Sequence, residues 1–179
     1  AAAPELYFYD GTVIGVQGAF STSAGYSEIR NGTFETVACT NHPDGSSAFY
    51  ALYIAGESGT VESHIYGGTF TSVSRVAAYI GNSNDGGLKK EAIAYIHGGS
   101  FTSGNGNNAV YVDDALGGLL ITGGTFSSDV AAYIPSGMKQ EEEGTVVKDT
   151  EKANVQVGDA YYKTLPEALA AARTGDTVE

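Results

Sequence analysis

The chain has 179 residues, a net charge of −12 and only 9 Lys plus Arg, so it offers no basic cluster for nucleic acid or an anionic membrane surface. Hydrophobic residues make up 42% of it, with 12 Tyr and 7 Phe, which is enough to bury the core of one domain. Its single cysteine, Cys39, excludes an internal disulfide, and no apolar run is long enough to cross a membrane.

A short motif recurs along the chain at irregular intervals. Its copies are "FYDGTVIG", "IRNGTFET", "IYGGTFTS", "IHGGSFTS" and "ITGGTFSS". They share an apolar residue, a glycine step, a hydroxyl and a bulky apolar residue. The aligned glycines are Gly11, Gly32, Gly68, Gly99 and Gly124. Conserving the order of these residue types at variable spacing is typical of a structural repeat.

A second pattern follows each motif and places an aromatic residue in a short apolar segment, as in "ALYIA", "AAYIG" and "AVYVD". The aromatic positions are Phe20, Tyr53, Tyr79, Tyr111 and Tyr133. A third apolar segment, such as "TVESHI" or "EAIAYI", leads into the next motif. Each repeat therefore carries three short β-type segments separated by Gly, Asn and Ser, without helical periodicity.

Repeats of this kind predict an all-β solenoid, in which each unit buries its apolar side chains only by stacking on its neighbours. We expect a parallel β-helix of about five coils over residues 1–134. A β-sandwich is the weaker alternative, because only "EEEGTV" looks like a hairpin turn. Stacking predicts an interior column of Phe, a column of Thr or Ser, and glycine at a tight corner.

The end of the chain departs from the repeat. In "VQVGDAYYKTLPEALAAARTGDTVE", Thr164 is a predicted helix N-cap and Pro166 falls in the first turn. Residues 135–153, with the acidic "QEEEG" turn, are predicted to close the stack as a hairpin and linker. Residues 154–179 then form a strand-helix-strand segment.

These segments carry a resemblance. The "GGTF" coils, the "AAYIPSG" ending and "YKTLPEALAAARTGDTV" resemble the right-handed parallel β-helix (pectin-lyase-like) repeats of large cell-surface proteins of gut Firmicutes. The resemblance implies a right-handed coil and a bacterial, secreted or cell-wall-attached location. It also implies a monomeric module of a longer tandem-repeat chain, with 154–179 as the truncated cap of the next module.

Enzymes with this fold are mainly polysaccharide lyases and hydrolases. A lyase needs clustered carboxylates and a cationic base, and a hydrolase needs carboxylates at a fixed separation. The acidic pair Asp113–Asp114 follows the strand "AVYV", but neighbouring repeats offer no third carboxylate in register. An Asp pair in a solvated turn is the simpler interpretation. We expect no enzyme activity, with a polysaccharide lyase or hydrolase, active or degenerate, as the alternative.

Metal and cofactor sites are not expected either. His64 and His97 stand at different distances from the motif glycine, which predicts that they do not converge on a metal, and His42 lies in a separate loop. No glycine-rich stretch matches a phosphate-binding loop. Cys39 is interpreted as a small half-buried side chain rather than a reactive thiol.

Two features remain as candidate binding sites. If Ile80 points inward, the aromatic column points outward as a ladder for sugar rings or a protein surface, although stacked tyrosines can also serve only the scaffold. Loops 37–47, 81–90 and "GNGNN" offer polar groups on a rigid scaffold, or are tolerated insertions. The candidate ligand-binding residues are Tyr53, Tyr79, Tyr111, Tyr133, His42, Asp44, Asn105 and Asn107.

The sequence thus predicts a non-catalytic bacterial surface module for adhesion or binding. Its expected partner is a host protein (a glycoprotein or immunoglobulin) or a glycan, with no nucleic acid, membrane insertion or cofactor. A passive structural stalk is a further alternative.

Overall fold

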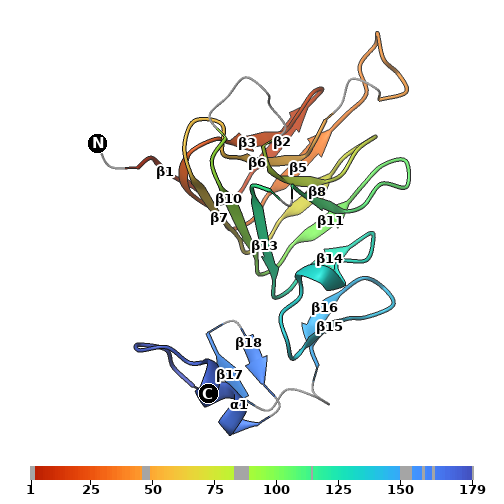
Figure 1. Ribbon diagram of the computed structural model, residues 1–179. Helices are drawn as coiled ribbons and strands as arrows, with labels where there is room; N and C mark the ends of the chain where they lie inside the picture. The colour runs from red at the N-terminus through yellow and green to blue at the C-terminus, as the bar shows by residue number, and fades with distance from the viewer. Residues whose placement is uncertain are drawn as a thin grey trace.

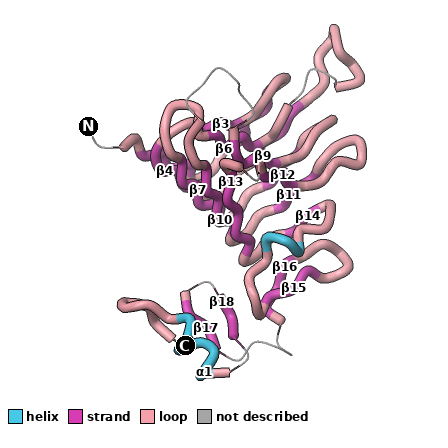
Figure 2. Tube along the Cα trace, viewed as in Figure 1, coloured by secondary structure: helices cyan, strands magenta, loops and turns pink. Residues whose placement is uncertain are grey.

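The fold is all-β and was obtained as a computed structural model (Figure 1). The structure describes residues 3–45, 49–82, 89–113, 115–149, 155–158, 160–162 and 164–178. Within these residues, three parallel sheets lie beside one another, and Figure 2 shows how loops of different length connect them. No helix among them is both long and apolar enough to cross a membrane.

The chain visits the three sheets in rotation, so each strand from β1 to β11 pairs with the strand three positions later. The first sheet contains β1 (Glu5–Phe8), β4 (Gly25–Ile29), β7 (Val61–Ile65), β10 (Ala92–Ile96) and β13 (Gly117–Ile121). The second contains β2 (Thr12–Gly15), β5 (Thr33–Thr36), β8 (Thr69–Thr71), β11 (Ser100–Thr102) and β14 (Thr125–Phe126). The third contains β3 (Phe20–Thr22), β6 (Leu52–Ala55), β9 (Ala78–Gly81) and β12 (Val110–Val112). This arrangement is that of a parallel β-solenoid and confirms the predicted all-β class.

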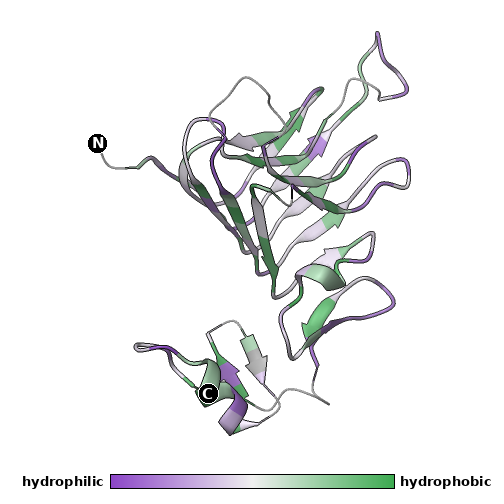
Figure 3. Cartoon of the chain, viewed as in Figure 1, coloured by the Kyte–Doolittle hydropathy of each residue, from purple (hydrophilic) through white to green (hydrophobic). Residues whose placement is uncertain are grey.

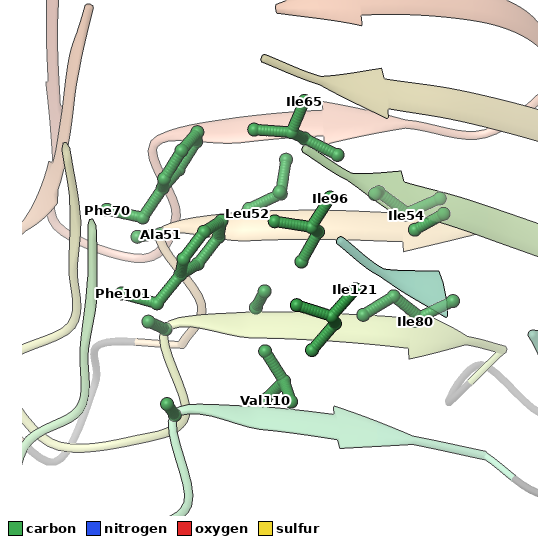
Figure 4. Close-up of a cluster of buried hydrophobic side chains, with 14 of the residues drawn as sticks. Ala51, Leu52, Ile54, Ile65, Phe70, Ile80, Ile96, Phe101, Val110 and Ile121 are labelled. Atoms are coloured by element: carbon green, nitrogen blue, oxygen red, sulfur yellow. The ribbon is translucent and has the colours of Figure 1, made fainter. Parts of the chain in front are cut away.

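The repeated motif sets the register of the stack. Its apolar residues pair from strand to strand in the first sheet as Ile29, Ile65, Ile96 and Ile121. Its bulky residues pair in the second sheet as Phe34, Phe70, Phe101 and Phe126. The phenylalanine rings stack with centroids 4.8, 4.6 and 5.0 Å apart. Both columns are buried and converge on the same interior (Figure 4), while Figure 3 shows the loops as mainly hydrophilic.

The motif glycine turns the chain from the first sheet into the second. Gly68 and Gly99 have φ of 105° and 103°, a region that side chains rarely adopt. A Cβ on Gly68 would lie 3.0 Å from the Gly32 carbonyl oxygen of the neighbouring coil. Glycine is therefore required by both the corner and the close stacking of corners, as the sequence predicts.

Two smaller units follow β14. After the 3₁₀ turn η1 (Ala131–Tyr133), β15 (Met138–Gln140) and β16 (Val146–Lys148) form an antiparallel hairpin at the acidic turn. The Val146 N–H donates to the Gly124 carbonyl at 2.8 Å, so the hairpin covers the backbone edge beside β14.

The last described strands, β17 (Val155–Val157) and β18 (Ala160–Tyr162), are antiparallel and precede the helix α1 (Leu165–Ala171). Thr164 is the N-cap in a capping box with Glu167, as predicted for Thr164. Ala168 is buried, whereas Leu165 and Leu169 are exposed. The predicted domain boundaries at 134 and 153 remain a prediction.

The interior phenylalanine column predicts a large cost for truncation. Replacing Phe101, which is fully buried between Phe70 and Phe126, with alanine should lower the free energy of unfolding by about 3–5 kcal/mol. Tyr9→Ala is the control, because Tyr9 is 69% exposed and should cost about 0.5 kcal/mol or less. Urea unfolding followed by circular dichroism measures both, and equal losses would contradict the columnar core.

Candidate functional site

The outer face of the third sheet carries a tyrosine column. Tyr53, Tyr79 and Tyr111 pair in register on β6, β9 and β12. The alternating residues Ile54 and Ile80 are fully buried, so the tyrosines point away from the interior, as predicted from the position of Ile80.

The column is a packed cluster rather than an open ladder. Tyr111 is 49% exposed and Tyr53 is half-buried, but Tyr79 is only 7% exposed. The cause is Tyr50, whose ring lies 4.9 Å from that of Tyr79 and 5.5 Å from that of Tyr53. Tyr79 therefore serves the scaffold, which is the alternative that the sequence left open, rather than an exposed ladder. Tyr50 precedes the strand and has no counterpart in the repeat, so the pattern gave no signal for it.

Phe20 and Tyr133 do not belong to the column. Phe20 pairs with Leu52, whereas Ser21 takes the position opposite Tyr53. A shift of one residue reverses the face, and the Phe20 ring therefore packs inward, 5.6 Å from Phe34. Tyr133 lies in the 3₁₀ turn η1, half-buried against the core, where no strand extends the third sheet.

A groove lies at the Tyr53 end of the column. Its volume is about 630 Å³, and its lining includes Phe49, Tyr50, Tyr53, Glu57 and Gln17. The Tyr53 hydroxyl donates to the Glu57 carboxylate at 2.9 Å, and Phe49 is 44% exposed. Burial raises the pKa of Tyr50, so its hydroxyl stays protonated at neutral pH. The groove thus combines aromatic walls with a carboxylate acceptor and an amide.

Two of the three predicted polar loops contact the same residue, Ser74, which lies between them. The Ser74 hydroxyl donates to the Gly45 carbonyl at 2.6 Å, and the Asn107 amide donates to the Ser74 carbonyl at 2.8 Å. His42, Asp44 and Asn105 are exposed beside these contacts. Asn107 also donates to Gly104, so its amide holds the loop itself. The third predicted loop, 81–90, lies mostly outside the described residues.

The acidic pair of the enzyme alternative is described only in part. The Asp113 carboxylate accepts a hydrogen bond from the Ala115 N–H at 3.1 Å, which is the geometry of a capped turn. Asp114 lies outside the described residues. Asp113 therefore stabilises its own turn, and the interpretation of the pair stays a prediction.

The outer face of the first sheet carries a cluster that the sequence analysis missed. It consists of residues in three neighbouring strands and of the residue that follows each strand: Tyr26, Glu28 and Arg30 at β4, Glu62, His64 and Tyr66 at β7, and Tyr95 and His97 at β10. His64 Nδ1 lies 3.3 Å from His97 Nε2. The difference in register gave no sign of this contact, because residues two positions out of register can still be diagonal neighbours on one face of a sheet. Whether the two histidines bind a metal stays a prediction.

Hydrogen bonds and charges organise this cluster. The Tyr26 hydroxyl donates to the Glu28 carboxylate at 2.5 Å, and this hydrogen bond lowers the pKa of Glu28. Burial raises the pKa of Glu28, but the Arg30 guanidinium paired with the carboxylate lowers it again. The same hydrogen bond raises the pKa of Tyr26. The Arg30 guanidinium lies over the Tyr66 ring, 4.2 Å from its centroid. Glu28 is consequently an ionised acceptor in a fixed position.

Among the residues that the structure describes, no group of three or more His, Cys, Asp or Glu side chains could hold a metal ion. Comparison with known proteins does not assign the chain: no protein-family model matches it, and neither a curated protein nor a solved structure is significantly similar to it.

The packed tyrosine cluster predicts a loss of stability at alkaline pH. Burial, with the charge of Asp113 second, raises the pKa of Tyr79 from about 10 to about 12. The folded state then holds this proton more tightly than the unfolded state, so stability is complete below pH of about 10 and falls as pH rises toward about 12. Tyr79→Phe should flatten that fall relative to wild type in urea unfolding across the window, and Tyr111→Phe should not. The same slope in wild type and Tyr79→Phe would refute the assignment.

Proposed function

We propose that the chain is a non-catalytic binding module of a bacterial surface, and that the groove at Phe49, Tyr50, Tyr53 and Glu57 takes a saccharide ring of a host glycan or glycoprotein. The groove is the observation that supports the proposal. In the same proposal the solenoid is right-handed with about five coils. It belongs to a secreted or wall-attached tandem-repeat protein related to the surface proteins of gut Firmicutes.

The chemistry of the groove suits a sugar. A hexose presents an apolar face of C–H groups, which packs on aromatic rings such as those of Phe49 and Tyr50. Its edge presents hydroxyl donors. The Glu57 carboxylate has about four acceptor positions, so it can accept from a ligand hydroxyl as well as from Tyr53. Gln17 adds an amide donor and acceptor to the same lining.

A second groove, of about 730 Å³, lies at the end of the stack and fits a ligand less well. It runs between η1 and the β15–β16 hairpin, and its aromatic residue, Phe126, is 2% exposed. The Gln140 side chain already bonds the backbone of Val130, Ser128 and Gly144. This groove is a seam held by structural hydrogen bonds.

A protein partner such as an immunoglobulin would use a different part of the face. Tyr111 is the exposed end of the tyrosine column and Phe49 is the exposed wall of the groove. An interface that spans both would depend on both side chains, whereas a sugar in the groove depends on Phe49, Tyr50 and Glu57 and does not contact Tyr111. Variants therefore separate the two kinds of partner.

Glycan-array binding followed by calorimetry with the best saccharide tests the proposal. Tyr50→Ala should weaken binding by about 10-fold through the lost aromatic contact, and Glu57→Gln should weaken it severalfold. Tyr111→Ala and Tyr95→Ala, the latter on the first sheet, are matched controls expected to leave the affinity unchanged. Circular dichroism verifies that each variant is folded.

Other outcomes are decisive against the groove. A loss of binding in Tyr111→Ala equal to that in Tyr50→Ala would assign the face to a protein-sized partner. Absence of binding to every saccharide on the array would leave the stalk as the better account. Polysaccharide cleavage that disappears in Asp113→Ala would instead favour the enzyme.

A further inference from the structure

We propose that His64 and His97 form a binding site for a divalent transition-metal ion, for which Zn²⁺ is the probe. The site lies on the first sheet. His64 is in β7 and His97 follows β10, and these two strands run side by side in Figure 1. It goes beyond the proposed saccharide groove, which lies on the third sheet, so either proposal can fail without the other.

The two imidazoles face each other head to head. Their planes differ by 12° and their centroids are 5.6 Å apart. His64 Nδ1 and His97 Nε2 are 3.3 Å apart. For that distance between the nitrogens, the centroids are farthest apart when both nitrogens lie on the line that joins them, and 5.6 Å is close to this limit. Each ring therefore directs one nitrogen at the other, and a cation between them would interact with both.

The remaining ring nitrogens are held in a way that favours metal binding. His64 Nε2 lies 3.0 Å from the Glu62 carboxylate, which is an acceptor when ionised. His64 must then carry its proton on Nε2, which leaves Nδ1 with a free lone pair toward His97. A carboxylate on the far nitrogen of a ligating histidine is the common second contact of metal sites, where it fixes the tautomer and strengthens the ligand.

His97 has access to the matching tautomer. Its Nδ1 lies 3.1 Å from the Thr122 hydroxyl, and that hydroxyl lies 3.5 Å from the Ile96 carbonyl, to which it donates. With its proton given to Ile96, the Thr122 oxygen accepts from Nδ1–H of His97. A proton on His97 Nε2 would donate to His64 Nδ1 across the 3.3 Å between them. With the proton on Nδ1 instead, Nε2 offers its lone pair to a cation that takes the place of that hydrogen bond.

The distance between the nitrogens fits zinc. With Zn–N bonds of about 2.0–2.1 Å and tetrahedral angles, two nitrogen ligands lie about 3.3 Å apart. The observed 3.3 Å therefore needs only a turn of each ring, so that the lone pairs meet at an ion beside the line between them. Imidazole ligands favour Zn²⁺, Cu²⁺ or Ni²⁺ over Ca²⁺ or Mg²⁺. Since the described residues supply no third ligand, water would fill the other positions.

The surroundings are stiff and suit a cation. The Tyr95 ring stacks on His64 at 4.7 Å and the Tyr66 ring on His97 at 4.8 Å, so both ligands are positioned before binding. Among the described residues, the charged contacts of this face include Glu62, which touches His64, and Glu28, opposite His64 on β4, with Arg30 paired to Glu28. Two carboxylates against one guanidinium leave a negative local field.

Calorimetric titration with ZnCl₂ tests the site in the full chain. The background protein carries C39S and H42A, because Cys39 Sγ and His42 Nδ1 lie 3.5 Å apart and could bind Zn²⁺ themselves. The background protein should bind one equivalent of Zn²⁺ with micromolar affinity. Adding His64→Ala or His97→Ala should weaken binding by at least about 10-fold, and Glu62→Gln should weaken it by about 10-fold through the lost second contact.

The matched control is Tyr111→Ala on the third sheet, which should bind Zn²⁺ as the background does. A structural effect alone would alter the circular dichroism spectrum, whereas loss of a ligand leaves it intact and changes only the Zn²⁺ isotherm. Absence of Zn²⁺ binding in the folded background protein would overturn the inference. Equal affinity in the background and His64→Ala proteins would overturn it too.

Discussion

Burial of equivalent side chains in columns is the constraint on which the rest of the molecule depends. A single coil encloses too few apolar side chains to form a core, so each gains its burial from the coils on either side. Phe70 lies between Phe34 and Phe101, and Ile65 pairs with Ile29 and Ile96. Because the side chains alternate between the faces of a strand, fixing these columns inside also fixes which residues point outward.

The same constraint explains the polar residues of the interior. Ser27 and Ser63 are buried on β4 and β7, and their hydroxyls are 2.7 Å apart. Thr36 and Ser72 form a second buried pair at 3.3 Å. Parallel stacking places like side chains together, so a hydroxyl buried in one coil finds its partner in the next. No buried side-chain nitrogen or oxygen of the described residues lacks a partner.

The repeat made the scaffold predictable, but it carried little information on the site. The motif glycines, the Phe and Ile columns and the order of three strands follow from residues that recur, and each recurrence is a separate indication of the same geometry. The errors lie where recurrence fails. Phe20 looked like a member of the tyrosine column, but its ring is packed inside. It therefore pairs with Leu52, and Ser21, the next residue, pairs with Tyr53. Tyr50 belongs to no repeat, and it is the residue that closes the column. His64 and His97 lie out of register along the motif, which hid a diagonal contact that only the sheet reveals.

Function in a fold of this kind is therefore confined to residues that stacking does not use. A side chain that points inward packs against the coils above and below it, so replacing it lowers the stability of the fold. A side chain that points outward does not pack in the interior. Side chains as different as Glu28, His64 and Tyr95 can therefore lie at paired positions on neighbouring strands and form one row across the sheet. Neighbouring residues of such a row lie on strands about 4.8 Å apart, close enough for their side chains to touch. A parallel solenoid can hence present several independent sites on its sheets, because altering one outward row leaves the columns beneath it unchanged. The tyrosine groove and the histidine pair occupy two such faces of the same stack.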